Sequence, residues 1–321
     1  MSYSIKGIIK PSDLIPFQKA KNLLNLFITF VLFALAFLFI YIHSTHNHWS
    51  LTFVLMLMSG VIQHTLATFI HEAAHGHVFS HKLMNDRAGH FLFAAPLFSY
   101  LEDYRFFHWE HHRFTGKIKK DPELMLYRSM GVKPNYKSRK EIIFLFIQTL
   151  MGITAIKGLL FLNKFYMEKR SSGEIKKPGF FEHLSLIFWV AVIPWIFWRN
   201  ELLISYLIVW IIPMITIFTT LLMWHGLGEH IRERDCDLSQ NTLTHHFNFV
   251  TTLILYPINS SYHLEHHLFP QLPWYSLKKF RIWAEKNPEY KKGAEQLVAS
   301  SYFFGEKSVF KLSFPLILNK D

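Results

Sequence analysis

Four long apolar stretches constrain what this chain can fold into more than any other feature of its sequence. A helix rises about 1.5 Å per residue, so roughly 20 apolar residues cross the hydrocarbon core of a bilayer. Half of the 321 residues are hydrophobic and 18% are charged, against about 25% charged in a typical soluble domain. We therefore predict an all-α integral membrane protein with a single domain, residues 1–321, and four transmembrane helices in two hairpins. The expected spans are residues 23–42, 51–70, 183–198 and 202–224.

The basic residues indicate which side of the membrane each connection faces. The chain has a net charge of +11, from 34 lysines and arginines and 23 acidic residues. Nearly all of the basic residues lie near the N-terminus, in residues 71–180 and in residues 225–321. By the positive-inside rule we expect both termini and a histidine-rich helical cap, built from these two long regions, to be cytoplasmic. The basic residues come with no recognition motif for nucleic acid, so we expect no such partner.

Two further apolar segments are less regular, and one cysteine stands alone. Residues 91–101 are too short to span and contain Pro96, which favours an interfacial or re-entrant segment. Residues 142–162 are interrupted by polar residues and glycines, and we interpret them as a helix on the membrane surface rather than a span. Cys236 is the only cysteine, which excludes an intrachain disulfide and a thiolate metal site. We expect it to be an inert loop thiol.

Histidines cluster in three boxes with fixed spacings. Residues at i, i+3 and i+4 of a helix project from one side, within an arc of about 100°. In the expected topology all three boxes lie on the cytoplasmic side of the membrane. That topology uses only apolar runs and basic residues, so the agreement is independent support. The boxes are His71 and His75; His108, His111 and His112; and His263, His266 and His267.

These boxes predict metal ions held by nitrogen ligands. Neutral imidazole suits iron, zinc, copper and nickel, and eight imidazoles exceed what one ion accepts, so two ions are the economical interpretation. Each box also contains a glutamate: Glu72, Glu110 or Glu265. A carboxylate beside a ligating imidazole can accept its other N–H and fix its tautomer. The alternative is that these glutamates are solvated cytoplasmic charges.

The motifs HEAAH at 71–75, HWEHHRFT at 108–115 and NSSYHLEHHLFPQLP at 259–273 resemble the histidine boxes of the membrane fatty acid desaturases, a di-iron superfamily that includes hydroxylases. The resemblance covers residues 60–275 and includes Asp121-Pro122-Glu123 after the second box. It implies two iron ions, dioxygen as co-substrate, and a separate electron donor of the ferredoxin or cytochrome b5 type. The substrate that it implies is a fatty acyl chain on coenzyme A or acyl carrier protein, or an intact lipid.

The family also has a histidine between the fourth span and the third box, and here His230 within Gly228-Glu229-His230 fits that role. His225 is the competing candidate, and His64 is expected to pack as a polar residue. Asp121 and Glu229 join the three glutamates above as possible hydrogen-bond acceptors for ligating imidazoles. The resemblance thus implies nine metal ligands: His71, His75, His108, His111, His112, His230, His263, His266 and His267.

The expected function is O2-dependent desaturation of a fatty acyl chain or related lipid at a di-iron centre. A hydroxylase or acetylenase of the same superfamily stays open, because the boxes do not separate these outcomes. His71-Glu72-x-x-His75 also matches the HExxH pattern of zinc hydrolases, so an intramembrane zinc metalloprotease is a remote alternative. A membrane metal transporter is another, although it would need ionisable residues along a path through the spans.

Overall fold

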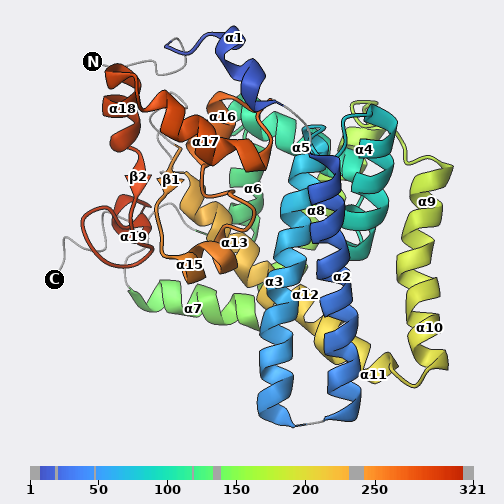
Figure 1. Ribbon diagram of the computed structural model, residues 1–321. Helices are drawn as coiled ribbons and strands as arrows, with labels where there is room; N and C mark the ends of the chain where they lie inside the picture. Colours follow the sequence, from blue (N-terminus) through green and yellow to red (C-terminus); the bar gives the residue numbers. More distant parts are fainter. Residues whose placement is uncertain are drawn as a thin grey trace. The chain divides into compact units, whose positions relative to one another are not determined.

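The computed structural model describes residues 8–18, 21–46, 48–117, 119–132, 139–230 and 242–313. Cys236, expected to be an inert thiol, lies outside these residues. The described chain is mostly helical (Figure 1). It divides into two compact units: unit 1 comprises residues 1–19, 109–145 and 223–321, and unit 2 comprises residues 20–108 and 146–222.

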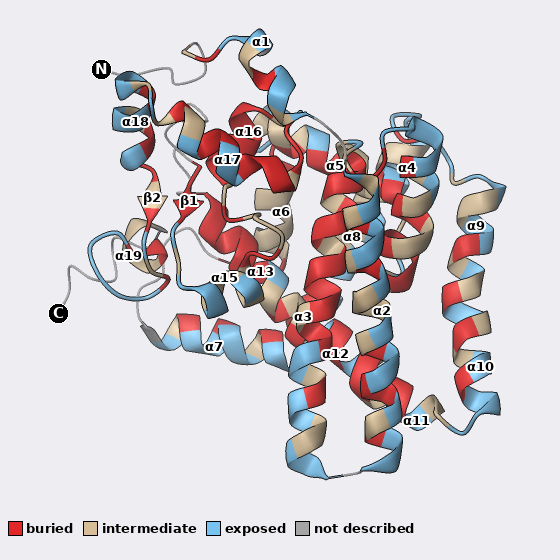
Figure 2. Cartoon of the chain, in the orientation of Figure 1, coloured by how far each residue is buried: buried red, intermediate tan, exposed pale blue. Residues whose placement is uncertain are grey.

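Within the described residues, four helical stretches are long and apolar enough to cross a membrane, at 22–45, 49–74, 180–199 and 203–229. The first two are single helices of unit 2, α2 (Asn22–Thr45) and α3 (Trp49–Ala74), which pack side by side (Figure 1). In the most apolar part of each helix, 28% of the residues are buried in α2 and 61% in α3. Figure 2 shows the same contrast. The more buried α3 is thus the inner helix of the pair.

The other two stretches are interrupted where proline occurs. The third consists of α9 (Phe180–Ile187), the π-helical η5 (Phe188–Val192) and α10 (Ile193–Arg199). The fourth consists of α11 (Leu203–Tyr206), the π-helical η6 (Leu207–Ile211), α12 (Ile212–Ile215) and α13 (Ile217–Glu229).

Pro194 and Pro213 each lie in the first turn of the helix that follows a π turn, as its second residue. The missing proline N–H leaves a carbonyl without its helical donor, which favours such a turn. Gln63 of α3 donates a hydrogen bond to the carbonyl of Trp210 in η6 at 2.7 Å. This polar residue inside an apolar span therefore satisfies a backbone group of a neighbouring one.

The segment expected as one surface helix is two helices. α7 (Arg139–Leu150) and α8 (Ile153–Ser171) meet at an angle of 75°. Gly152 lies at the break with φ of +76°, and a Cβ there would lie 3.2 Å from the carbonyl oxygen of Ile215. The prediction of a single continuous helix is wrong, because the chain turns at a position that only glycine occupies easily.

The apolar segment at 91–101 also has an irregular form. It follows α4 (Lys82–Ala88) and comprises most of the π-helical η3 (Gly89–Ala94), the 3-10 turn η4 (Ala95–Leu97) and the first residue of α5 (Leu101–Phe114). Phe93 stacks on Phe69 of α3 with ring centroids 4.9 Å apart. The segment is thus packed on the helix that carries the first histidine box.

Two apolar clusters lie in the described residues of unit 1. The first gathers side chains from α6 (Pro122–Ser129), α7, α13 and α19 (Val309–Ser313). The second joins η2 (Ile15–Phe17) and α1 (Pro11–Leu14) to α16 (His263–Leu268), α17 (Trp274–Ala284) and α18 (Pro288–Glu295). Helix α15 (Phe249–Leu255) comes before α16 in the chain.

Among the described residues, the expectation of an all-helical chain has an exception in a short pair of strands. Strand β1 (Thr244–His245) pairs in parallel with β2 (Val298–Ala299), Thr244 opposite Val298 and His245 opposite Ala299. This pair ties the segment before the third histidine box to the segment after α18.

Candidate metal centre

Unit 1 brings four histidines together from three distant parts of the chain. His111 lies on α5, His230 follows α13, and His263 and His267 lie one turn apart on α16. All four side chains are buried, and one ring nitrogen of each lies within 4.8 Å of the others. We call these residues the four-histidine set.

The spacing of the ring nitrogens in the four-histidine set matches that of ligands around one ion. The Nε2 atom of His230 lies 3.2 Å from Nε2 of His111 and 3.1 Å from Nε2 of His263. Two nitrogen ligands at right angles, each roughly 2.1 Å from a metal, are about 3.0 Å apart. Neither ring nitrogen of His267 has a hydrogen-bond partner among the described residues, although both are buried. Because buried polar atoms need partners, a bound cation fits the set.

Carboxylates orient two of these imidazoles. His263 donates from Nδ1 to Oε1 of Glu229 at 2.9 Å, and His111 donates from Nδ1 to Oδ1 of Asp121 at 2.9 Å. Each bond places the proton on Nδ1 and leaves Nε2 directed at the other imidazoles. Asp121 also accepts from the backbone N–H of Glu123 as the cap of α6, so the helix start and the imidazole share one carboxylate.

His225, the alternative to His230, has a different role. Its Nε2 donates to Oε1 of Glu229 at 2.7 Å, one helical turn away. It is absent from the groups of described residues that could hold a metal, and so is His64, which is buried on α3. His225 therefore supports Glu229, which in turn holds His263.

Electrostatics favours neutral imidazoles at three of the four positions. Burial, together with neighbouring imidazoles, lowers the pKa of His230, His263 and His267. Burial would also lower the pKa of His111, but the nearby Glu123 and Asp121 raise it to about 9. The two carboxylates therefore favour a positive charge on the His111 ring, and a metal ion at Nε2 would replace the proton that carries it.

Unit 2 gathers the first box and the first histidine of the second. Nε2 of His75 lies 2.8 Å from Nε2 of His108, and the rings of His71 and His108 have centroids 4.4 Å apart. Glu72 contacts Nδ1 of His71 and Nδ1 of His77, each at 3.3 Å. We call His71, His75 and His108 the three-histidine set, and Glu72 is its carboxylate partner.

The remaining two predicted ligands meet in unit 1. Nε2 of His112 lies 3.0 Å from Nε2 of His266. The ring of His112 also stacks on that of His267, with centroids 4.2 Å apart. Every predicted ligand therefore has another predicted ligand as a close neighbour within its own unit.

Two of the expected carboxylate partners contact other groups instead. Glu110 pairs with Arg113 at 3.7 Å, and Glu265 accepts hydrogen bonds from Thr244, Arg281 and Tyr290. Helix geometry explains both, because a residue two positions after the first histidine of a box lies about 200° around the helix axis. Both glutamates thus lie on the side of their helices opposite the imidazoles.

Glu123 and His77 lie next to the predicted ligands, but the expected set omits them. Oε2 of Glu123 lies 3.2 Å from Nε2 of His111, and Oε1 accepts a hydrogen bond from the Tyr127 hydroxyl at 2.8 Å. Burial raises the pKa of Glu123 above its usual range. The Asp-Pro-Glu sequence after the second box was the available signal for Glu123, whereas nothing in the local sequence singles out His77.

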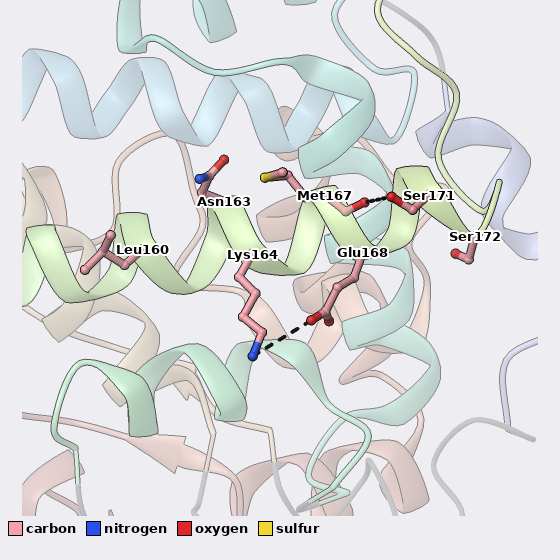
Figure 3. A pocket seen from close by; sticks show the side chains of 7 residues that line it. All are labelled: Leu160, Asn163, Lys164, Met167, Glu168, Ser171 and Ser172. Carbon is pink, nitrogen blue, oxygen red and sulfur yellow. Dashed lines mark hydrogen bonds and ion pairs between the residues drawn. The ribbon is translucent and has the colours of Figure 1, made fainter.

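A separate open depression of about 730 Å³ lies along α8 (Figure 3). Its lining contains no histidine, and Lys164 and Glu168 form an ion pair there at 3.9 Å. Both charges are largely solvated, so this depression is a surface feature rather than part of the metal centre. The lining residues are Leu160, Asn163, Lys164, Met167, Glu168, Ser171 and Ser172.

Two known desaturases are similar to this chain in sequence. The dihydrorhizobitoxine desaturase of Bradyrhizobium elkanii is 29% identical over 256 residues, 77% of this chain and 71% of that protein. The chloroplastic omega-6 fatty acid desaturase of Spinacia oleracea is 23% identical over 220 residues, which is 65% of this chain but only 47% of that protein. The sequence profile of the fatty acid desaturases matches residues 47–294. With its histidine boxes inside that match, the chain belongs to the fatty acid desaturase family.

Proposed function

We propose that this protein introduces a double bond into a fatty acyl chain or related lipid, using dioxygen at a di-iron centre. The observation that carries the proposal is the four-histidine set, in which buried imidazoles from three segments converge with Nε2 atoms 3.1 and 3.2 Å apart. Family membership supports desaturase chemistry and iron as the metal, and the all-nitrogen set is compatible with iron, one of the metals that imidazole binds.

The nine predicted histidines are proposed to hold the two ions. His111, His230, His263 and His267 form one site, for which the fit is described above. The remaining predicted histidines are assigned to metal binding on the strength of the family motif alone. Bound iron would supply the activation of dioxygen that an unreactive C–H bond requires, since acid–base side chains have nothing to act on there. The polypeptide holds the imidazoles, fixes their tautomers through Glu229 and Asp121, and shields them from water.

The membrane arrangement is also a proposal. The four candidate spans would form two hairpins with both termini, the histidine-rich cap and the active site on the cytoplasmic side, as the basic residues indicate. Electrons would come from a separate donor of the ferredoxin or cytochrome b5 type. The acyl chain would be carried on coenzyme A, on acyl carrier protein or in an intact lipid. The names of the two relatives give different substrates, and analysis of the products identifies the one for this chain.

Expression of the full chain in a host with a simple lipid profile tests the function. Mass spectrometry of the host's fatty acids should show a species that has lost two hydrogen atoms. A His267→Ala variant, which removes one imidazole of the four-histidine set, should produce none of it. A hydroxylated product without an alkene would contradict the desaturase assignment and favour the hydroxylase alternative.

A further inference from the structure

The helix that carries the third histidine box has a buried anion on its far side. Glu265 lies between His263 and His266, is fully buried, and is directed away from the imidazoles. Its surroundings include two further large side chains that are almost inaccessible to solvent, Arg281 at 2% exposed and Tyr290 at 0%. A buried carboxylate needs both a countercharge and hydrogen bonds, and its partners supply them.

Three separate elements hold this carboxylate. Arg281 of α17 donates through Nη1 to Oε1, and the Tyr290 hydroxyl of α18 donates to the same oxygen at 3.0 Å. Thr244 of β1 donates from Oγ1 to Oε2 at 2.5 Å. The guanidinium also lies over the Tyr290 ring, 5.8 Å from its centroid. Both oxygens of Glu265 are thereby fixed in position, and with them the rotation of α16 about its own axis.

Helix α16 needs such external support. It is only six residues long and has no side-chain cap at its start. Isolated helices of this length are unstable in water, since nucleation costs more than a few hydrogen bonds return. Three of its six side chains are predicted metal ligands, and a small rotation of the helix would move all of them at once. Contacts from outside the helix must therefore set its orientation.

Buried ion pairs are better suited to fixing orientation than to adding stability. The cost of removing two charges from water largely cancels their attraction, so a neutral pair of similar shape is often as stable. Such a pair still favours one arrangement, because any other leaves a buried charge unpaired. The Glu265–Arg281 pair has this character, since both members are buried and hydrogen-bonded.

We propose that Arg281 and Glu265 are positioning residues of the metal centre, which set the rotation of α16 and so the directions of His263, His266 and His267. The inference rests on the proposed metal-binding function. It assigns α17 and α18, which carry no predicted ligand, a role in metal affinity.

Arg281 offers a matched control in its second partner. Its Nε donates to Oε1 of Glu285 at 2.6 Å, and Glu285 is the residue directly after α17. Glu285 is partly exposed, and its hydrogen bond runs to Arg281 rather than to a residue of α16. The substitution Glu285→Gln thus removes a carboxylate from the same arginine without touching the helix that carries the ligands.

The test measures Co²⁺ binding to the purified full-length protein in detergent, by visible absorption and competition with a chelator, together with the melting temperature. We expect Arg281→Met to raise the Kd for Co²⁺ at least tenfold, and Glu285→Gln to leave it within twofold of wild type. The double variant Glu265→Gln/Arg281→Met has no unpaired buried charge. It should recover much of the melting temperature that Arg281→Met loses, while its Kd stays about tenfold raised.

The outcomes separate positioning from stability. A double variant that recovers wild-type affinity along with its melting temperature would show that Arg281 acts through stability alone, and would overturn the inference. So would Arg281→Met that binds Co²⁺ as tightly as wild type. Wild-type protein that binds no Co²⁺ would instead remove the proposed metal centre itself, and this inference with it.

Discussion

His263 donates from Nδ1 to Oε1 of Glu229 at 2.9 Å, which joins the third histidine box to the end of the fourth candidate span. The same oxygen accepts a hydrogen bond from His225 at 2.7 Å. On its other side, the His263 ring places Nε2 3.1 Å from Nε2 of His230. One buried carboxylate thus fixes the tautomer of a predicted ligand and links residues more than thirty positions apart.

The substitution Glu229→Gln should weaken metal binding tenfold to a hundredfold, because the amide is a poorer acceptor for the His263 N–H. The measurement is the Kd for Co²⁺ or Fe²⁺ by chelator competition. Glu110→Gln is the matched control, since Glu110 pairs with Arg113 rather than an imidazole. Equal affinities in the two variants would argue against a role for Glu229 in orienting His263.

His230→Ala and His225→Ala should have different effects although the residues are five positions apart. His230 belongs to the four-histidine set, so its loss should lower the metal-to-protein ratio from about two towards one. His225 contacts Glu229 and is outside the set, so His225→Ala should keep the ratio near two. Elemental analysis of the purified variants decides the question, and the reverse pattern would make His225 the ligand.

Gly228→Ala should destabilise the protein by about 1–3 kcal/mol, because the added methyl has no space. A Cβ at Gly228 would lie 2.0 Å from the hydroxyl oxygen of Tyr256, and 3.4 Å from the nearest ring carbons. Removing that hydroxyl in Gly228→Ala/Tyr256→Phe should therefore restore most of the loss. Melting temperatures of both variants and of Tyr256→Phe provide the check. Failure of the double variant to recover would mean that the space is limited by other atoms.

His245 should make the protein less stable in acid. Burial lowers its pKa to about 3, while the unfolded chain binds this proton near pH 6.5. Between these values unfolding takes up a proton, so stability falls as pH falls, by at most about 1.4 kcal/mol per pH unit. His245→Gln, which keeps a donor for the Gly228 carbonyl, should have a shallower dependence. Melting curves of metal-free protein from pH 4 to 7 measure it, and identical slopes would refute the assignment.

Much of the architecture follows from simple patterns in the sequence. A run of apolar residues long enough to cross a bilayer forms a helix there, because a helix satisfies its own backbone hydrogen bonds. The four expected spans correspond to four helical stretches in the described residues that are long and apolar enough to cross a membrane. The helix ends could not be predicted this way. Helix α3 continues to Ala74, beyond the apolar run, and so includes Glu72. Backbone hydrogen bonds do not require apolar side chains, so a helix need not stop where the membrane does.

The histidine spacing predicts which imidazoles share a helix face, and His263 and His267 of α16 do meet in the four-histidine set. The same geometry could have placed Glu110 and Glu265 on the opposite faces of their helices. The partner of Glu265 could not have been foreseen, because Arg281 belongs to another helix and the pair forms only through tertiary packing. Nothing in the local pattern of either residue indicates that they meet.

The four-histidine set takes its members from α5, from the residue that follows the fourth candidate span and from α16. An ion held there would act as a reversible cross-link between segments that lie 33 or more positions apart along the chain. Ligand linkage adds about 4 kcal/mol of stability when free ion exceeds its Kd a thousandfold, and nothing when the ion is absent. The amount of this protein in a cell would then depend on the supply of the metal that it binds, since newly made chains without metal would unfold more often and be degraded sooner.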